Sequence, residues 1–119
     1  PHAMTFLSQE VSMFALHERA KVLVQKYFTL EKELIGLLQE IDRQGIHKKL
    51  GYNSMHQYCV VALGMNDHQA YGFWSVARKC IEIPALQTAI DTGKITASVA
   101  KRLVPGFRLS TFRDIQILA

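Results

Sequence analysis

The sequence predicts an all-α fold, a compact bundle of about six to seven helices that contains a helix-turn-helix. Three observations support this prediction. Apolar residues recur at steps of three and four along most of the 119 residues, which is the spacing of one face of an α-helix. No segment alternates apolar and polar residues as a half-buried strand does. Glycines and capping residues separate the apolar runs, so the connecting loops should be short.

The composition is that of an ordinary globular protein, with 49% hydrophobic and 20% charged residues. A chain of this length usually folds as one compact domain. No run of 18 uncharged apolar residues occurs, and Gln9 and Glu10 interrupt the first apolar run. Neither a membrane span nor a signal peptide is therefore predicted, and we expect a cytoplasmic protein without a membrane partner.

Residues 5–45 are predicted to form an N-terminal helical pair. Residues 1–4 are excluded, because the three residues ahead of Met4 are typical of a cloning remnant or a disordered start. The first helix covers residues 6–25 and either breaks near Tyr27 or runs through. The second covers residues 30–44, with Thr29 as N-cap and Gly45 at its end. Its apolar stripe should contain Leu30, Leu34, Leu37, Leu38 and Ile41. Such helices can form a homodimer, here through residues 5–45, or can simply cover the core.

Residues 46–119 are predicted to form the helix-turn-helix-containing region. A short helical turn at 46–50 and a tight turn at 51–53 lead to a helix over 55–63. Ser54 is its N-cap, and Gln57 completes a capping box. The residues expected to face inward are Met55, Tyr58, Cys59 and Ala62.

The segment from Leu63 to Lys79 has the pattern of the turn and second helix of a helix-turn-helix. Gly64 supplies the left-handed residue of the turn. Asn66 caps the next helix and Gln69 completes its capping box. Ala70, Phe73, Trp74 and Ala77 should face inward. In a DNA-reading helix-turn-helix this second helix lies in the major groove. An ordinary helical hairpin without a partner fits the same pattern.

Three further helices follow. Pro84 begins a helix over 84–91, which ends before Gly93. Thr96 caps a helix over 97–104, in which Val99, Ala100 and Leu103 face inward. Ser110 caps a last helix from Thr111 onward. The chain ends within the apolar pattern of that helix, so we expect the native protein to continue.

The positive charge is concentrated after residue 42. Residues 1–42 carry four Lys or Arg and six Asp or Glu, a net charge of −2, and residues 43–119 carry ten and four, a net charge of +6. Such a surface suits a polyanion, although an ordinary solvated surface fits too. The residues that the second helix would present to the major groove of double-stranded DNA are Asp67, His68, Gln69, Tyr71 and Ser75, and Asn66 is a further candidate for DNA contact. Those on the phosphate side are Arg78, Lys79, Lys94, Lys101 and Arg102.

Gln69 is the best candidate for a base contact, because its amide can form two hydrogen bonds with adenine. Asp67 and Glu82 weigh against DNA binding, since carboxylates repel phosphates. Cys59 and Cys80 fall on inward-facing positions and are predicted to be core residues. His56 and Cys59 could bind a metal, but no second ligand pair lies nearby, so neither a metal nor a cofactor is expected.

A series of residues after position 50 recurs in the order of a known pattern: Gly51, Tyr52, Ser54, Tyr58, Cys59, Leu63, Gly64, Ala70, Tyr71, Ala77, Arg78, Pro84, Gly93, Ile95 and Ser98. Residues 30–105 thereby resemble the helical region that precedes the nuclease domain of many bacterial HNH-endonuclease-type proteins. The shorter stretch from Leu63 to Thr96, with its Leu-Gly, Ile-Pro and Gly-Lys-Ile-Thr segments, resembles the DNA-binding part of ParB-type partition proteins.

The resemblance implies a helical DNA-associated module, standing alone or as the accessory domain of a larger nuclease-like or regulatory protein. HNH catalysis needs a His-Asn-His set on a ββα unit. This sequence shows no strand pair, and its histidines are scattered, so the module is expected to be non-catalytic. The alternative is a protein-interaction or dimerisation module without nucleic-acid binding, in which Tyr71, Phe73 and Trp74 or the first two helices contact a partner. An enzyme is the least supported class, because no nucleophile–base pair or glycine-rich phosphate loop is found.

Overall fold

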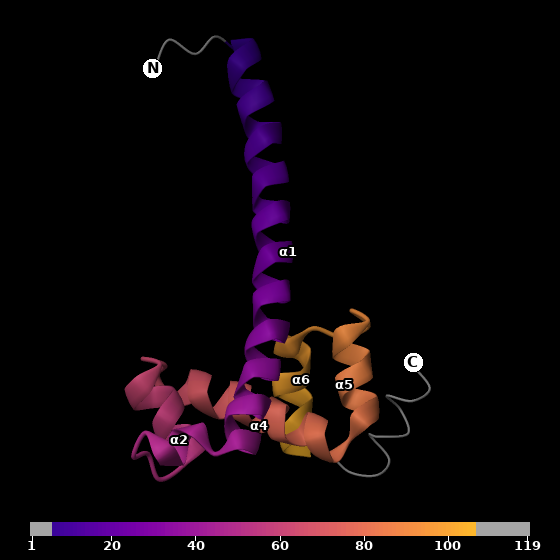
Figure 1. Cartoon of the computed structure of the whole chain (residues 1–119). Helices are drawn as coiled ribbons and strands as arrows, with labels where there is room; N and C mark the ends of the chain where they lie inside the picture. Colours follow the sequence, from indigo (N-terminus) through magenta and orange to yellow (C-terminus); the bar gives the residue numbers. More distant parts are fainter. Residues whose placement is uncertain (1–5, 107–119) are drawn as a thin grey trace. The chain divides into compact units, whose positions relative to one another are not determined.

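The computed structural model describes the backbone of residues 6–106 and the side chains of residues 12–105. All regular secondary structure in this part of the chain is helical, so the predicted all-α class is confirmed (Figure 1). The elements in order are α1 (Phe6–Gln44), α2 (Ile46–Lys49), α3 (Met55–Gln57), the π-helical turn η1 (Tyr58–Ala62), α4 (Asp67–Glu82), α5 (Pro84–Asp91), α6 (Ala97–Leu103) and the 3₁₀ turn η2 (Val104–Gly106). The predicted helix from Thr111 lies outside the described residues.

The chain divides into two compact units, unit 1 at Pro1–Leu30 and unit 2 at Glu31–Ala119. The division falls inside α1 and not after Gly45. Helix α1 is continuous over 39 residues, so the N-terminal segment is one helix that runs through Tyr27 and not a helical pair. Thr29 lies within it and is not an N-cap. The residues around the expected break include neither glycine nor proline, so no local feature ends the helix there.

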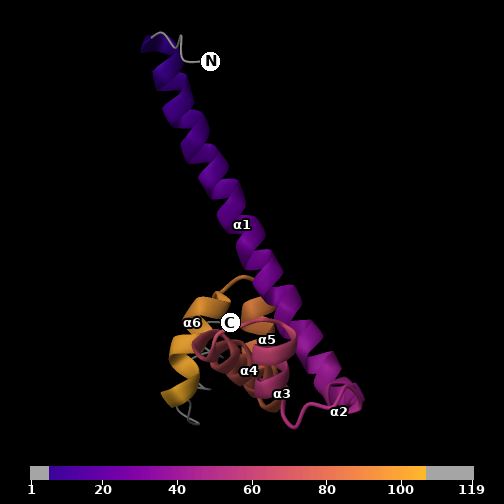
Figure 2. The ribbon, with the colours of Figure 1, turned by 90° about the vertical axis from the view of Figure 1, so that its left-hand side faces the viewer.

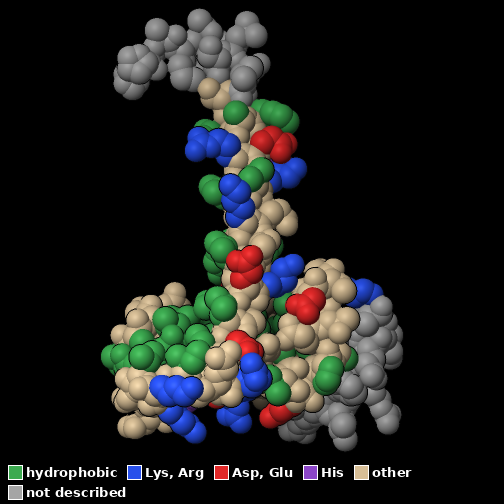
Figure 3. Space-filling view, viewed as in Figure 1, with side chains coloured by type: hydrophobic (Ala, Val, Ile, Leu, Met, Phe, Trp, Pro, Cys, Tyr) green, Lys and Arg blue, Asp and Glu red, His purple; other side chains and the backbone are tan. Residues whose placement is uncertain are grey.

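Unit 1 contributes residues 12–30 of α1 to the described side chains, and most of its apolar side chains are exposed. A single helix cannot bury an apolar face against itself. The exposed fraction exceeds 40% for Met13, Phe14, Leu16, Val22, Leu23, Val24, Tyr27 and Leu30. Figure 3 shows such apolar side chains between charged ones along this part of α1.

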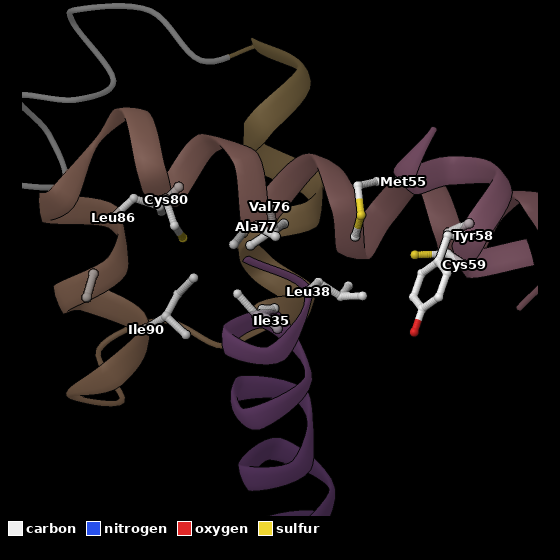
Figure 4. Close-up of a cluster of buried hydrophobic side chains, with 14 residues drawn as sticks. Ile35, Leu38, Met55, Tyr58, Cys59, Val76, Ala77, Cys80, Leu86 and Ile90 are labelled. Carbon is white, nitrogen blue, oxygen red and sulfur yellow. The ribbon is translucent and has the colours of Figure 1, made fainter. Parts of the chain in front are cut away.

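The core lies in unit 2 and is built from the end of α1 together with α3, η1, α4, α5 and α6 (Figure 4). Ile35 and Leu38 of α1 are fully buried in it. The predicted stripe of α1 was therefore partly wrong, because Leu30 and Leu37 are 62% and 60% exposed. The buried face follows Glu31, Ile35 and Leu38, which are spaced as one side of a helix.

Helix α4 occupies the middle of unit 2, since it contacts α3, η1, α5, α6 and η2 (Figures 1 and 2). Its inward positions agree with the prediction: Ala70 and Ala77 are fully buried, and Phe73 and Trp74 pack half-buried against the core. The predicted bounds of α5 and its N-terminal proline are also confirmed. None of the described helices combines the length and apolar composition needed to cross a membrane.

The turn before α4 forms as the sequence predicted. Gly64 has a φ of 76°, where a side chain would be strained. The Asn66 side chain accepts a hydrogen bond from the Gln69 N–H at 2.7 Å, and Gln69 Oε1 accepts one from the Asn66 N–H at 3.1 Å. Both halves of the capping box are therefore present.

The helix before this turn differs from the predicted 55–63 helix. Ser54 accepts a hydrogen bond from the Gln57 N–H at 3.0 Å, but Gln57 Oε1 accepts one from Asn53 and not from Ser54. The chain then widens into η1, where the Leu63 N–H donates to the Tyr58 carbonyl. Ala62 is consequently exposed and not buried, because the wider π turn rotates its side chain away from the α-helical position.

Candidate nucleic-acid interface on α4

A stripe of polar side chains follows one side of α4. The small residues of α4 are buried in the core of unit 2, and this packing leaves the opposite side of the helix accessible. Side chains at steps of three and four share a helix face. On α4 this arrangement places Tyr71, Ser75 and Arg78 in line, with Asp67 before them and Glu82 after them.

The same stripe borders a surface groove of about 480 Å³ in unit 2. The groove is formed by the start of α3, the exposed side of α4 and η2. Its lining residues are Ser54, His56, Tyr71, Trp74, Ser75, Arg78, Lys79, Glu82 and Val104. Four residues of the predicted DNA-binding set therefore meet in one place: Tyr71, Ser75, Arg78 and Lys79.

Arg78 is the most available cation of this groove. It is exposed, and it has no ion-pair partner among residues 12–105. Lys79 Nζ lies 3.1 Å from Glu82 Oε2, so its charge is partly neutralised locally. His56 Nε2 lies 3.2 Å from Asp67 Oδ1 at the other end of the stripe. Among the described residues, the groove thus offers a guanidinium without an ion-pair partner, with the hydroxyls of Tyr71 and Ser75 beside it on the same stripe.

Two of the residues predicted to contact DNA at the start of α4 are occupied in the helix cap. Asn66 and Gln69 use their side-chain oxygens in the capping box. A two-bond contact of Gln69 with adenine needs both its oxygen and its amide nitrogen, so the cap would have to open first. His68 is exposed but does not line the groove. Of these three residues, His68 alone has no capping role.

Lys101 was predicted to lie on the phosphate side, but its side chain is engaged within unit 2. Its Nζ lies 3.3 Å from Oε2 of the buried Glu31 and 3.5 Å from the centroid of the Phe73 ring. Gly72 leaves room for this side chain, because a Cβ added there would be 3.1 Å from Lys101 Cδ. A cation with a buried carboxylate partner and an aromatic face serves the fold of unit 2.

Lys94 and Arg102 are exposed but do not line the groove. Lys94 lies in the turn before α6, and Arg102 lies within α6. Of the five cations predicted to contact phosphates, only Arg78 and Lys79 line the groove.

Ser54, His56 and Val104 line the groove and were not predicted as site residues. The sequence pattern placed Ser54 and His56 at the start of the helix before the turn. If this helix had been expected to cross α4, the two residues could have been predicted to lie beside the exposed side of α4. Cys59 is fully buried, whereas His56 borders the groove. No group of three or more potential ligands for a metal occurs among the described residues.

Both cysteines are buried in unit 2, as predicted. Burial raises the pKa of the Cys59 thiol. Burial, together with the charge of Asp91, raises the pKa of Cys80 to about 12. Neither thiol is therefore suited to act as a nucleophile, since thiols react as thiolates.

The polar stripe of α4 and the groove beside it together form the candidate interface of unit 2. When the chain is compared with family models, curated proteins and solved structures, no match is found. The likeness to HNH-associated and ParB-type regions therefore stays a prediction from the sequence.

Proposed function

We propose that unit 2 is a DNA-binding helix-turn-helix module, non-catalytic by itself, whose partner is double-stranded DNA. The observation that carries this proposal is the stripe of Tyr71, Ser75 and Arg78 on the accessible side of α4. The turn at Gly64 and the cap at Asn66 support it, because they separate α4 from η1 as a helix-turn-helix requires.

In this proposal α4 enters the major groove. Arg78 and Lys79 contact phosphates, and the hydroxyls of Tyr71 and Ser75 reach polar groups of the DNA beside them. His68 extends the contact toward the start of the helix. Gln69 contributes at most through its amide nitrogen while its oxygen remains in the cap. Lys101 is not included, because Glu31 binds it.

Two carboxylates of the stripe, Asp67 and Glu82, repel phosphates and so lower the expected affinity for DNA, although neighbouring side chains offset part of this repulsion. Glu82 forms an ion pair with Lys79, and Asp67 lies within hydrogen-bond distance of His56, so each carboxylate has a neighbour that can offset its repulsion of phosphates. Arg78 is then the residue on which phosphate binding should depend most. Such a weak module is suited to be the accessory domain of a larger nuclease-like or regulatory protein, and the cytoplasm is its expected location.

Titration of a fluorescently labelled duplex of mixed sequence with the full chain tests this proposal. We expect anisotropy to rise at low salt, and the affinity to fall steeply as salt increases, because phosphate contacts release counterions. No binding of duplex DNA at the lowest salt at which the protein stays folded would overturn the proposal. Circular dichroism in the same buffers checks the fold.

The second candidate is a helical protein-interaction or dimerisation module without nucleic-acid binding. The exposed apolar side chains of unit 1 favour it, as does Tyr71, which is 58% exposed. Binding of duplex DNA would argue against this candidate as the whole function, but not against dimerisation itself.

A further inference from the structure

Leucine recurs at every seventh position along α1. Leu16, Leu23, Leu30 and Leu37 are 60%, 59%, 62% and 60% exposed. A helix turns nearly twice in seven residues, so leucines at this spacing share one side of it. The chain therefore presents a row of large apolar side chains that its own core does not cover.

A second set of residues lies between the leucines. Met13, Ala20 and Tyr27 alternate with them at steps of three and four, so that the leucines occupy position d of a heptad and the second set position a. Met13 and Tyr27 are 70% and 52% exposed, and Ala20 is exposed too. This 3.5-residue period is the pattern by which two helices pack knobs into holes.

We propose that unit 1 pairs with unit 1 of a second copy of this chain as a parallel two-stranded coiled coil. The seam consists of Met13, Leu16, Ala20, Leu23, Tyr27 and Leu30. A heptad seam fits a helix that carries the same period, and a second copy carries it in the same register. Leucine at position d is also the residue that parallel dimers favour there.

The charges beside the seam favour the parallel orientation. Arg19 and Lys26 occupy position g, which flanks the seam. In an antiparallel pair over the same stretch, Arg19 of one copy would face Lys26 of the other, twice in the dimer. In a parallel pair Arg19 approaches Val24 of the second copy, so this repulsion is absent. Glu18 and Lys21, whose charged atoms lie 3.7 Å apart, are outside the a and d positions.

The dimer should be weak. Stable coiled coils usually have three or four heptads or more, and the seam from Met13 to Leu30 has fewer than three. The same spacing continues to Leu34 and Ile41, but these two residues pack half-buried against the core of unit 2. We therefore expect a monomer–dimer equilibrium that depends on protein concentration.

Sedimentation equilibrium of the full chain without DNA, over a wide range of concentrations, tests the pairing. We expect the mass to rise from monomer to dimer. Leu23→Lys should weaken dimerisation by about tenfold or more, because it places a charge in the seam. Val22→Lys is the matched control: Val22 is 52% exposed in the same helix but lies off the seam, and its variant should dimerise like the original chain.

A chain that stays monomeric up to its solubility limit would overturn the proposal. So would a mass above that of the dimer, or equal effects of Leu23→Lys and Val22→Lys. Circular dichroism distinguishes lost dimerisation from lost folding. If Leu23→Lys does not fold, the pairing is tested by Leu23→Ala against Val22→Ala in the same way.

A cysteine at position 23 tests the orientation. In a parallel dimer Leu23→Cys faces its own equivalent, so oxidised glutathione should link the two copies at this position, as mass spectrometry of peptides would show. Val22→Cys should form the link more slowly, and the buried Cys59 and Cys80 give little background. An antiparallel pair brings position 23 opposite Ala20, so efficient linkage in Ala20→Cys/Leu23→Cys but not in Leu23→Cys would overturn the parallel arrangement.

The pairing is independent of the proposed function, because it is measured without nucleic acid. A dimer would carry two copies of the α4 groove, and two linked sites raise the apparent affinity for one DNA molecule. A chain that binds DNA but stays monomeric up to its solubility limit would contradict the coiled coil and leave the proposed function standing.

Discussion

Lys101 of α6 and Glu31 of α1 form an ion pair across unit 2, with 3.3 Å between Nζ and Oε2. Glu31 is 3% exposed, and its other carboxylate oxygen is buried without a hydrogen-bond partner among the described residues. A buried carboxylate needs its cation, because removing one partner of such a pair leaves a charge that water cannot reach.

Replacing Lys101 should therefore destabilise unit 2. We expect Lys101→Met to lower the free energy of unfolding by about 3–5 kcal/mol, measured by urea denaturation followed by circular dichroism. Arg102→Met, a change at the exposed neighbour, should stay within about 0.5 kcal/mol. Lys101→Met/Glu31→Met should recover much of the loss, since no charge then remains buried. Equal effects of Lys101→Met and Arg102→Met would contradict this role.

Two glycines should respond in opposite ways to alanine. Gly64 has a φ of 76°, whereas Gly36 lies within α1, and an added Cβ would meet no atom within 4 Å at either position. Gly64→Ala should cost about 1–2 kcal/mol through backbone strain alone. Gly36→Ala should stabilise by about 0.5–1 kcal/mol, because glycine weakens a helix. Thermal unfolding measures both, and a stabilising Gly64→Ala would show that the turn is not as described.

Arg78 should control the salt dependence of DNA binding. If its guanidinium contacts one phosphate, Arg78→Ala should reduce the slope of log affinity against log salt by about 0.9. Arg102→Ala removes the same charge from an exposed site outside the groove and should leave the slope almost unchanged. Anisotropy titrations at several salt concentrations give both slopes. If Arg102→Ala lowers the slope and Arg78→Ala does not, the interface lies elsewhere on unit 2.

The raised pKa of Cys80 should make stability depend on alkaline pH. The unfolded thiol titrates near about 8.5, whereas the folded thiol keeps its proton until about pH 12. Between these values the unfolded chain has lost a proton that the native chain still binds, so the free energy of unfolding falls as pH rises. Below this range both states keep the proton, so the contribution of the buried thiol to the free energy of unfolding is fully present.

Comparison with Cys80→Ala isolates this effect from other groups that titrate at high pH. The difference in unfolding free energy between the original chain and the variant should shrink as the pH rises above about 9. Iodoacetamide should also react slowly with both thiols at neutral pH until urea unfolds the chain. If the difference in unfolding free energy between the original chain and Cys80→Ala stays constant over the alkaline range, the titration of Cys80 is not the cause of the pH dependence.

The predictions from the sequence succeeded where the interaction is local. The cap at Asn66, the turn at Gly64 and the proline start of α5 depend on residues within about four positions of one another, and the side-chain types reveal them directly. The buried face of α4, which contains Ala70 and Ala77, was also predictable, because the spacing of apolar residues along one helix is a local pattern. The sequence also assigned four candidate residues to one region, because they share a helix whose buried side could be predicted. These residues are Tyr71, Ser75, Arg78 and Lys79.

Predictions failed where a residue's interaction partner lies far away in the sequence. They also failed where more than one face of a helix could have been the buried one. Lys101 and Glu31 are 70 positions apart, so no local pattern could indicate that the lysine is used inside the fold. In α1 the apolar residues are numerous enough to form more than one stripe. Only the packing of Ile35 and Leu38 against the other helices of unit 2 determined which stripe is buried. Because this packing buries the face of Ile35 and Leu38, Leu30 and Leu37 remain exposed.

By itself the sequence determined the helical class, most helix ends and the turn before α4, because backbone geometry and capping are set by neighbouring residues. The tertiary structure decided which side of each helix is covered and which charges remain accessible. Packing brings distant residues into contact, and these contacts alone separate Arg78, which stays available to a ligand, from Lys101, which binds Glu31.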